Sequence, residues 1–319
     1  MIVTIRGLAR GFCAVTGMVL LGCANPPSLA PPPVSRPLTA QVESVLIQGE
    51  RWLTRGDMTR AGEAYETARQ MAESLDDRKG LIAALNGLGN VALSRGPTSQ
   101  AVTLHGRAVV LAQQLGEPGL MIDSLTALGA AEHRAGRVQE AERLYQQALD
   151  LAQHTADRSA EAVLRNNLGL VRQAMGDVEQ AEQLFQQAMA LNQAVGNLDS
   201  EASNHVNLGL LAEARHQYDV ADRELERALE LDKAAERRSE IAADLLRLGR
   251  IADRRGVPDR ALDYAERAYR SYLAQGDVTH AILALTHAAE YAGRSGRVEE
   301  VARLKKELNG LTSWSQPGR

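Results

Sequence analysis

The stretch RNNLGLVRQAMGDVEQAEQLFQQA, residues 165–188, holds the spacing that decides the fold. Gly176 follows Gly169 after seven residues, and Ala181 and Ala188 stand five and twelve residues beyond Gly176. A glycine inside a helix lets a second backbone approach closely, at a cost of about 1 kcal/mol against alanine. A glycine at a helix end is favoured because it adopts a left-handed conformation easily. Since residues seven apart share one helix face, the stretch predicts two closely packed helices joined by a turn at Gly176.

The same spacing recurs every 40 residues along the chain. The mid-helix Leu-Gly pair stands at residues 88–89, 128–129, 168–169, 208–209 and 248–249. The turn residue is Gly56, Gly96, Gly136, Gly176, His216, Gly256 and Gly296, and the first alanine is Ala61, Ala101, Ala141, Ala181, Ala221 and Ala261. A period of this length is the signature of an array in which each unit packs on its neighbours. The sequence therefore predicts an all-α solenoid of about seven helix-turn-helix repeats over residues 42–311.

These glycine and alanine columns resemble the tetratricopeptide repeat, and residues 165–169 are similar to the repeats of kinesin light chains. The resemblance implies a right-handed superhelical stack that binds other proteins. That family repeats about every 34 residues, whereas this chain repeats every 40. We expect the extra residues between the second alanine of one unit and the first helix of the next. There they lengthen either the helices or loops such as residues 115–119 and 195–199.

Residues 1–22 have the organisation of a secretory signal peptide. Two arginines precede an uncharged run, residues 11–21, that is too short to span a bilayer. The run ends in Leu20-Leu21-Gly22-Cys23, which resembles the lipobox of bacterial lipoproteins. That resemblance implies cleavage and acylation at Cys23, and Ala24 after the cysteine implies the periplasmic face of the outer membrane. The alternative is an ordinary signal peptide with an incidental cysteine.

The segments beside the repeats are predicted to lack a fold of their own. Six of the ten prolines lie between residues 26 and 37, so residues 23–41 should form an acylated cysteine followed by an extended tether. Residues 312–319 are predicted to be a disordered tail. The solenoid is therefore the only folded part that the sequence predicts.

The sequence contains no recognisable catalytic or metal-binding motif. Cys13, the other cysteine, lies in the predicted signal, so the mature chain would carry no thiol for a metal site. The seven histidines match neither metal nor nucleophile motifs, and no glycine-rich phosphate loop occurs. The net charge of −4 gives no indication of nucleic-acid binding. We therefore expect no enzymatic activity, cofactor, metal or small-molecule substrate.

Polar residues around the Leu-Gly columns are the candidate binding residues. In the resembled family the first helix of each unit lines a concave groove, and helical spacing places several polar residues there. They are Asn86, Asn90, Asn166, Asn167, Asn207, Arg247, Arg250 and Arg254. Asn167, Asn207 and Arg247 share one position in three successive repeats, which predicts a ladder that binds an extended peptide and its carboxylates. The alternative is that these residues form solvated helix faces.

The function predicted from these features is a lipid-anchored periplasmic scaffold that binds a protein or peptide segment in its groove. The resemblance to repeat lipoproteins implies a role in envelope assembly, secretion or pilus assembly. An architectural oligomer that self-associates without a ligand groove is the second hypothesis, and an enzyme is the third. Light scattering with a search for a captured partner distinguishes the first two, and a bound cofactor or metal would indicate the third.

Overall fold

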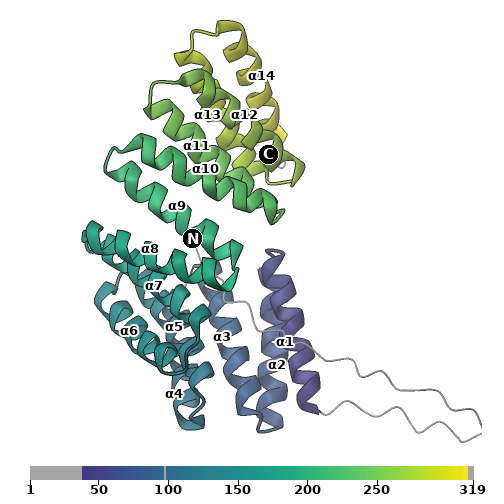
Figure 1. Cartoon of the computed structure of the whole chain (residues 1–319). Helices are drawn as coiled ribbons and strands as arrows, with labels where there is room; N and C mark the ends of the chain where they lie inside the picture. The colour runs from purple at the N-terminus through teal and green to yellow at the C-terminus, as the bar shows by residue number, and fades with distance from the viewer. Residues whose placement is uncertain (1–37, 97, 315–319) are drawn as a thin grey trace, which may run out of the picture. The chain divides into compact units, whose positions relative to one another are not determined.

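The structure is a computed structural model that describes residues 38–96 and 98–314. These residues form fourteen α-helices and no β-strand (Figure 1). The helices are α1 (Leu38–Thr54), α2 (Met58–Ser74), α3 (Arg78–Arg95), α4 (Thr98–Leu115), α5 (Pro118–Arg134), α6 (Val138–His154), α7 (Arg158–Ala174), α8 (Val178–Val195), α9 (Leu198–Ala214), α10 (Tyr218–Ala234), α11 (Arg238–Arg254), α12 (Pro258–Ala274), α13 (Val278–Arg294) and α14 (Val298–Trp314). The predicted signal peptide, Cys23 and most of the predicted tether lie outside the described residues.

The chain divides into two compact units, described separately below. Unit 1 ends at Leu151 and contains α1 to α5 and most of α6, and unit 2 begins at Ala152 and contains α7 to α14. In both units odd-numbered helices form hairpins with the helices that follow them, as in the pairs α3–α4 and α7–α8. Within each unit a hairpin also packs on the next one, as α2 does on α3 and α10 does on α11. This confirms the all-α, helix-turn-helix repeat fold.

The connections between helices are short turns built on left-handed residues. Gly176, between α7 and α8, has a φ of +83°, and His216 adopts +58° at the equivalent position although it carries a side chain. A second series of left-handed residues lies 20 residues from the first and includes Ala156, with a φ of +54°. The next helix then begins with a capping residue: the Asp177 carboxylate accepts a hydrogen bond of 3.2 Å from the Gln180 backbone amide. Such caps stabilise a helix by about 1 kcal/mol.

The additional residues of the long repeat lengthen the helices and not the loops. Every helix has 17 or 18 residues. The loop expected at 115–119 contains only Gly116 and Glu117 between helices, and that at 195–199 only Gly196 and Asn197. Two boundaries also differ from the prediction, since α1 begins within the segment assigned to the tether and α14 runs three residues past 311.

Close helix packing explains the Leu-Gly and alanine columns. A Cβ added to Gly169 would lie 2.5 Å from the ring of Phe185, and one on Gly129 would lie 2.7 Å from Tyr145. Both distances are far inside van der Waals contact, so only glycine fits against the aromatic ring. The alanines of the second helices, such as Ala181, are fully buried. None of the described helices combines the length and the hydropathy needed to cross a membrane.

Candidate functional site

A buried amide cluster links three helices of unit 2. Asn166 on α7 accepts hydrogen bonds at its Oδ1 from Asn204 (3.0 Å) and Asn207 (2.7 Å), both on α9. Asn192 on α8 donates to Asn204 at 2.7 Å. All four side chains are buried. Two of the predicted groove residues, Asn166 and Asn207, therefore bind each other and join the first helices of neighbouring repeats.

A buried carboxyl pair occupies the corresponding place one repeat later. Asp232 on α10 and Asp244 on α11 stand 40 residues after Asn192 and Asn204, and both are buried. The Arg237 guanidinium pairs with Asp232, and Arg247 Nη1 lies 2.7 Å from Asp244 Oδ1. Oδ2 of Asp244 has no hydrogen-bond partner among the described residues.

Burial dominates the electrostatics of this pair. Loss of solvent, with the charge of the neighbouring Asp232, raises the pKa of Asp244 to about 7. Burial also raises the pKa of Asp232, although the positive charge of Arg237 opposes the change. Two carboxyl groups in a dry site cannot both ionise cheaply, so the pair holds a proton at mildly acidic pH. Arg247, predicted to bind a ligand, instead compensates a buried charge of its own helix.

The buried residues Asn192, Asn204, Asp232 and Asp244 were not among the predicted site residues, although the sequence contains a signal for them. Most other repeats place small or apolar residues at these two positions, as in the pairs Ala72 with Ala84 and Ala152 with Leu164, although Ser124 and Tyr272 also occur there. Two polar residues twelve positions apart in these mostly apolar columns could therefore have been found by alignment of the repeats.

The remaining predicted residues have different environments. In unit 1, Asn86 is half-buried, donates a 3.1 Å hydrogen bond to Ser124 Oγ and lies 3.1 Å from His105 Nδ1. Asn90 is half-buried on α3, and Asn167 is buried on α7. Asn167, Asn207 and Arg247 do share one position of successive first helices, but the last two side chains are bound within the chain. Asn167 and Asn207 are buried and Arg247 is half-buried, so the structure does not expose the predicted ladder.

A row of charges with exposed arginines and half-buried carboxylates crosses the first helices α9, α11 and α13. Arg250 Nη2 lies 2.7 Å from Glu213 Oε2 on the preceding first helix, and Arg294 pairs with Asp253 in the same way. Arg254, one turn from Arg250, is exposed and forms no ion pair with a described residue. We call Glu213, Arg250, Asp253, Arg254 and Arg294 the charged stripe. Of the eight predicted groove residues, Arg250 and Arg254 belong to it.

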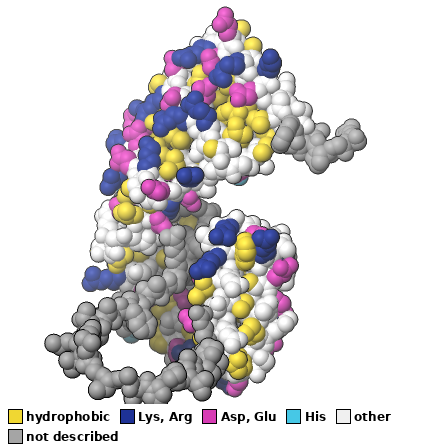
Figure 2. All heavy atoms as spheres, turned by 90° about the vertical axis from the view of Figure 1, so that its right-hand side faces the viewer, with side chains coloured by type: hydrophobic (Ala, Val, Ile, Leu, Met, Phe, Trp, Pro, Cys, Tyr) yellow, Lys and Arg dark blue, Asp and Glu magenta, His cyan; other side chains and the backbone are white. Residues whose placement is uncertain are grey.

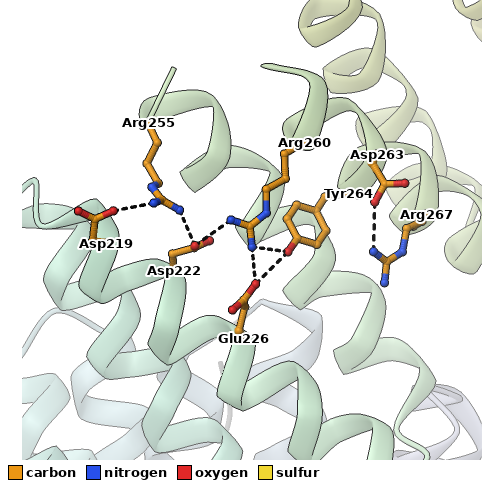
Figure 3. Close-up of polar contacts among 8 residues, drawn as sticks. All are labelled: Asp219, Asp222, Glu226, Arg255, Arg260, Asp263, Tyr264 and Arg267. Carbon is orange, nitrogen blue, oxygen red and sulfur yellow. Dashed lines mark hydrogen bonds and ion pairs between the residues drawn. The ribbon is translucent and has the colours of Figure 1, made fainter. Parts of the chain in front are cut away.

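A second charged network joins the second helices α10 and α12 (Figure 3). Arg255 Nη1 lies 2.5 Å from Asp222 Oδ2, and Arg260 Nη1 lies 3.0 Å from the same oxygen. Arg260 also pairs with Glu226, whose carboxylate accepts a 3.2 Å hydrogen bond from the Tyr264 hydroxyl. Figure 2 shows charged side chains of both signs interspersed with hydrophobic ones over this part of unit 2. The network therefore holds adjacent repeats together.

Residues 120–197 match the family model described as Tetratricopeptide repeat. These residues therefore form tetratricopeptide repeats. The model covers two of the seven hairpins, and the other hairpins share the same columns of residues. A comparison with curated protein sequences gives no match.

Solved structures with the same fold come from several kinds of protein. BtubC from P. vanneervenii is 22% identical, with a TM-score of 0.55 over 76% of this chain and 93% of that one. A signal transduction ATPase with a tetratricopeptide repeat sensor from Pyrococcus horikoshii is 13% identical, with a TM-score of 0.71 over 88% of this chain and 42% of that one. A Rap protein complexed with competence and sporulation factor is 15% identical, with a TM-score of 0.64 over 86% and 75%. At these identities the likeness concerns the fold.

The described residues contain no group of three or more His, Cys, Asp or Glu side chains arranged to hold a metal ion. What the tetratricopeptide fold provides is a series of parallel first helices with ordered side chains, a surface suited to protein binding. In the charged stripe, exposed arginines from successive repeats lie together on that surface.

Proposed function

We propose that the protein is a scaffold that binds a segment of another protein along the first helices of unit 2. The observation that carries this proposal is the charged stripe. Its arginines and carboxylates alternate across α9, α11 and α13, and Arg254 has no acidic partner of its own. A segment that carries carboxylates can pair with Arg254, and it can also displace Glu213 from Arg250. The Rap neighbour, crystallised with competence and sporulation factor, is an example of a complex formed on this fold.

The arginine contacts set the expected energetics. Side-chain hydrogen bonds to a charged partner contribute about 1.5 to 3 kcal/mol when shielded from water, and less when exposed. Replacing Arg250 and Arg254 together with alanine should therefore weaken binding by about one to two orders of magnitude. The fold should remain intact, because both side chains are exposed.

The test uses site-specific photocrosslinking in the native envelope. A photoreactive residue in place of Arg254 should crosslink to a discrete partner, identified by mass spectrometry. The matched position is Arg223, which is exposed on the second helix α10. The partner crosslinked at position 254 should bind the Arg250→Ala/Arg254→Ala variant more weakly than the wild type. The control variant, Arg223→Ala/Arg270→Ala, should bind the same partner normally. Equal crosslinking at both positions, or equal affinity of both variants, would remove the stripe as the binding surface.

The proposal includes lipid anchoring at Cys23 on the periplasmic face of the outer membrane. It is supported by the lipobox-like Leu20-Leu21-Gly22-Cys23 and by the prolines that follow. Each buried methylene of an acyl chain adds about 0.8 kcal/mol of membrane affinity, so two or more chains anchor stably. Labelled palmitate should enter the wild-type protein and not Cys23→Ala, and only the wild type should remain with washed membranes. A Cys23→Ala variant that stays with the membrane, together with an unlabelled wild type, would exclude the anchor.

A further inference from the structure

Arginines at the turn between the two helices of a repeat bind the second helix of the preceding repeat. Arg255 contacts Asp219 (2.7 Å) and Asp222 on α10, as Figure 3 shows. Arg215 contacts Glu179 and Glu182 on α8, and Arg95 donates to Thr59 on α2 at 2.8 Å. In each case the arginine contacts the residue 36 positions earlier, so the same stacking contact recurs wherever a later repeat carries this arginine.

The first repeat carries the same arginines with no described helix to receive them. Arg55 stands at the position of Arg215 and Arg255, and Arg60 stands at that of Arg260. Both guanidiniums lie over the ring of Trp52, at 5.3 and 4.6 Å from its centroid. Arg55 forms no ion pair with a described residue, and Arg60 has only a 3.5 Å contact with Asp57.

The surface around these arginines corresponds to a helix-binding face in later repeats. Leu248 and Ile251 of α11 are fully buried, whereas Gln48 and Arg51 at the same positions of α1 are exposed. In Figure 2, Lys and Arg side chains gather with hydrophobic ones at the end of unit 1 where α1 stops. The first repeat therefore presents a basic face around the Trp52 ring, at the place where later repeats accept a second helix.

Charge complementarity excludes two occupants of this face. Residues 1–37 of the chain contain no aspartate or glutamate, so the N-terminal segment cannot supply carboxylates. In a head-to-tail second copy, α14 would present Glu299, Ala302 and Lys306 at the positions of Asp219, Asp222 and Glu226. An alanine and a lysine there give one carboxylate in place of three and add a repulsive charge.

We infer that this face binds an acidic α-helix of a partner protein, which docks as the second helix of an additional repeat. The network in Figure 3 defines the ligand chemistry: carboxylates at i, i+3 and i+7, as in Asp219, Asp222 and Glu226. The carboxylates at i and i+3 of the partner helix would pair with Arg55, and those at i+3 and i+7 would pair with Arg60. This surface lies in unit 1 and is distinct from the charged stripe.

The test uses a peptide with the sequence of α10, residues 218–234, as the probe. The full chain carries Trp314→Phe, so that Trp52 is the single tryptophan and its fluorescence reports on the face directly. The peptide should change the Trp52 emission in a saturable way. Because exposed ion pairs contribute up to about 1 kcal/mol each, Arg55→Gln/Arg60→Gln should weaken binding about tenfold. A peptide with Asp219→Asn, Asp222→Asn and Glu226→Gln should lose a similar factor.

The matched control is Arg78→Gln/Arg107→Gln, which removes the same charge from other exposed sites of unit 1. It should bind the acidic peptide normally, and circular dichroism should show all variants equally helical. Equal affinity of the Arg55→Gln/Arg60→Gln variant, or of the neutral peptide, would overturn the inference. So would an absence of peptide binding together with a Trp52 response to vesicles of phosphatidylglycerol and phosphatidylcholine, since the face would then bind anionic lipid.

Discussion

Asp244→Asn tests how the buried carboxyl pair of unit 2 affects stability. Asp244 lies in a fully buried position of α11 beside Asp232, and the surrounding charged or titratable groups are Arg237, Arg247 and Tyr272. Asparagine has the shape of the protonated acid and can donate a hydrogen bond to Asp232. The substitution therefore fixes the pair in the form that the folded protein prefers.

The sign of the effect follows from the raised pKa. Asp244 has a pKa of about 7 in the folded protein, against an ordinary value of 3.8. Between these limits the folded state binds more protons than the unfolded state, so the free energy of unfolding falls as the pH rises from about 4 to about 7. At about 1.4 kcal/mol per tenfold change in proton affinity, the loss amounts to at most about 4 kcal/mol. Because Asp232 shares the proton, we expect about 2 to 4 kcal/mol.

Hydrogen exchange of the α10 and α11 amides, corrected for intrinsic rates, measures the local opening free energy at pH 5 and pH 8. The gain in local opening free energy of Asp244→Asn over the wild type should be about 2 kcal/mol larger at pH 8 than at pH 5, because part of the wild-type loss is already complete at pH 5. Asp263→Asn, which changes an exposed carboxylate on α12, is the control and should show no such pH-dependent gain. If the local opening free energies of Asp244→Asn and the wild type differed by the same amount at pH 5 and pH 8, the reasoning would be refuted.

Two further substitutions test the packing columns. Gly169→Ala should lower the free energy of unfolding by about 1 to 2 kcal/mol in urea titrations, because overpacking against Phe185 outweighs the helix-propensity gain. Gly249→Ala is the control: its added Cβ would lie no closer than 3.3 Å to its neighbours, so it should change the free energy of unfolding by less than about 1 kcal/mol. Equal losses in the two variants would contradict the close-packing argument. His105 is fully buried and burial lowers its pKa to about 4 from 6.5, so the wild type should lose about 2 kcal/mol as the pH falls from 8 to 5. His105→Phe should abolish that loss, as measured by exchange of the α4 amides, and an unchanged pH dependence would exclude His105 as its source.

The fold could be predicted because each hairpin repeats the same steric requirement. Gly129 and Gly169 recur at one spacing because an aromatic ring sits against each of them, and the sequence alone reveals that spacing. Loop length could not be predicted, since six added residues leave the columns unchanged whether they extend a helix or a turn. The short turns became evident only from the observed ends of α4 and α8.

The candidate site was predictable only in part, because the residue type does not determine a polar side chain's partner. Arg250 and Arg254 are exposed as expected, whereas Asn166 and Asn207 bind each other across two repeats. That choice depends on the distance between neighbouring first helices, which the period does not specify. Asn207 and Arg247 therefore occupy equivalent positions in the repeat, but their side chains have different surroundings.

The buried polar pairs of unit 2 specify the order in which the repeats stack, which the shared glycine and alanine columns cannot do. Repeats with identical glycine and alanine columns could pack on one another in more than one order, because each apolar face fits every other. Asn192 with Asn204 and Asp232 with Asp244 fit only each other: an amide or carboxyl placed against Ala152 or Leu164 would be buried without a partner, at a cost of about 1 to 3 kcal/mol. Since α9 and α11 each carry one member of a polar pair and together carry most of the charged stripe, the same contacts that fix the repeat order also hold the proposed binding surface in register.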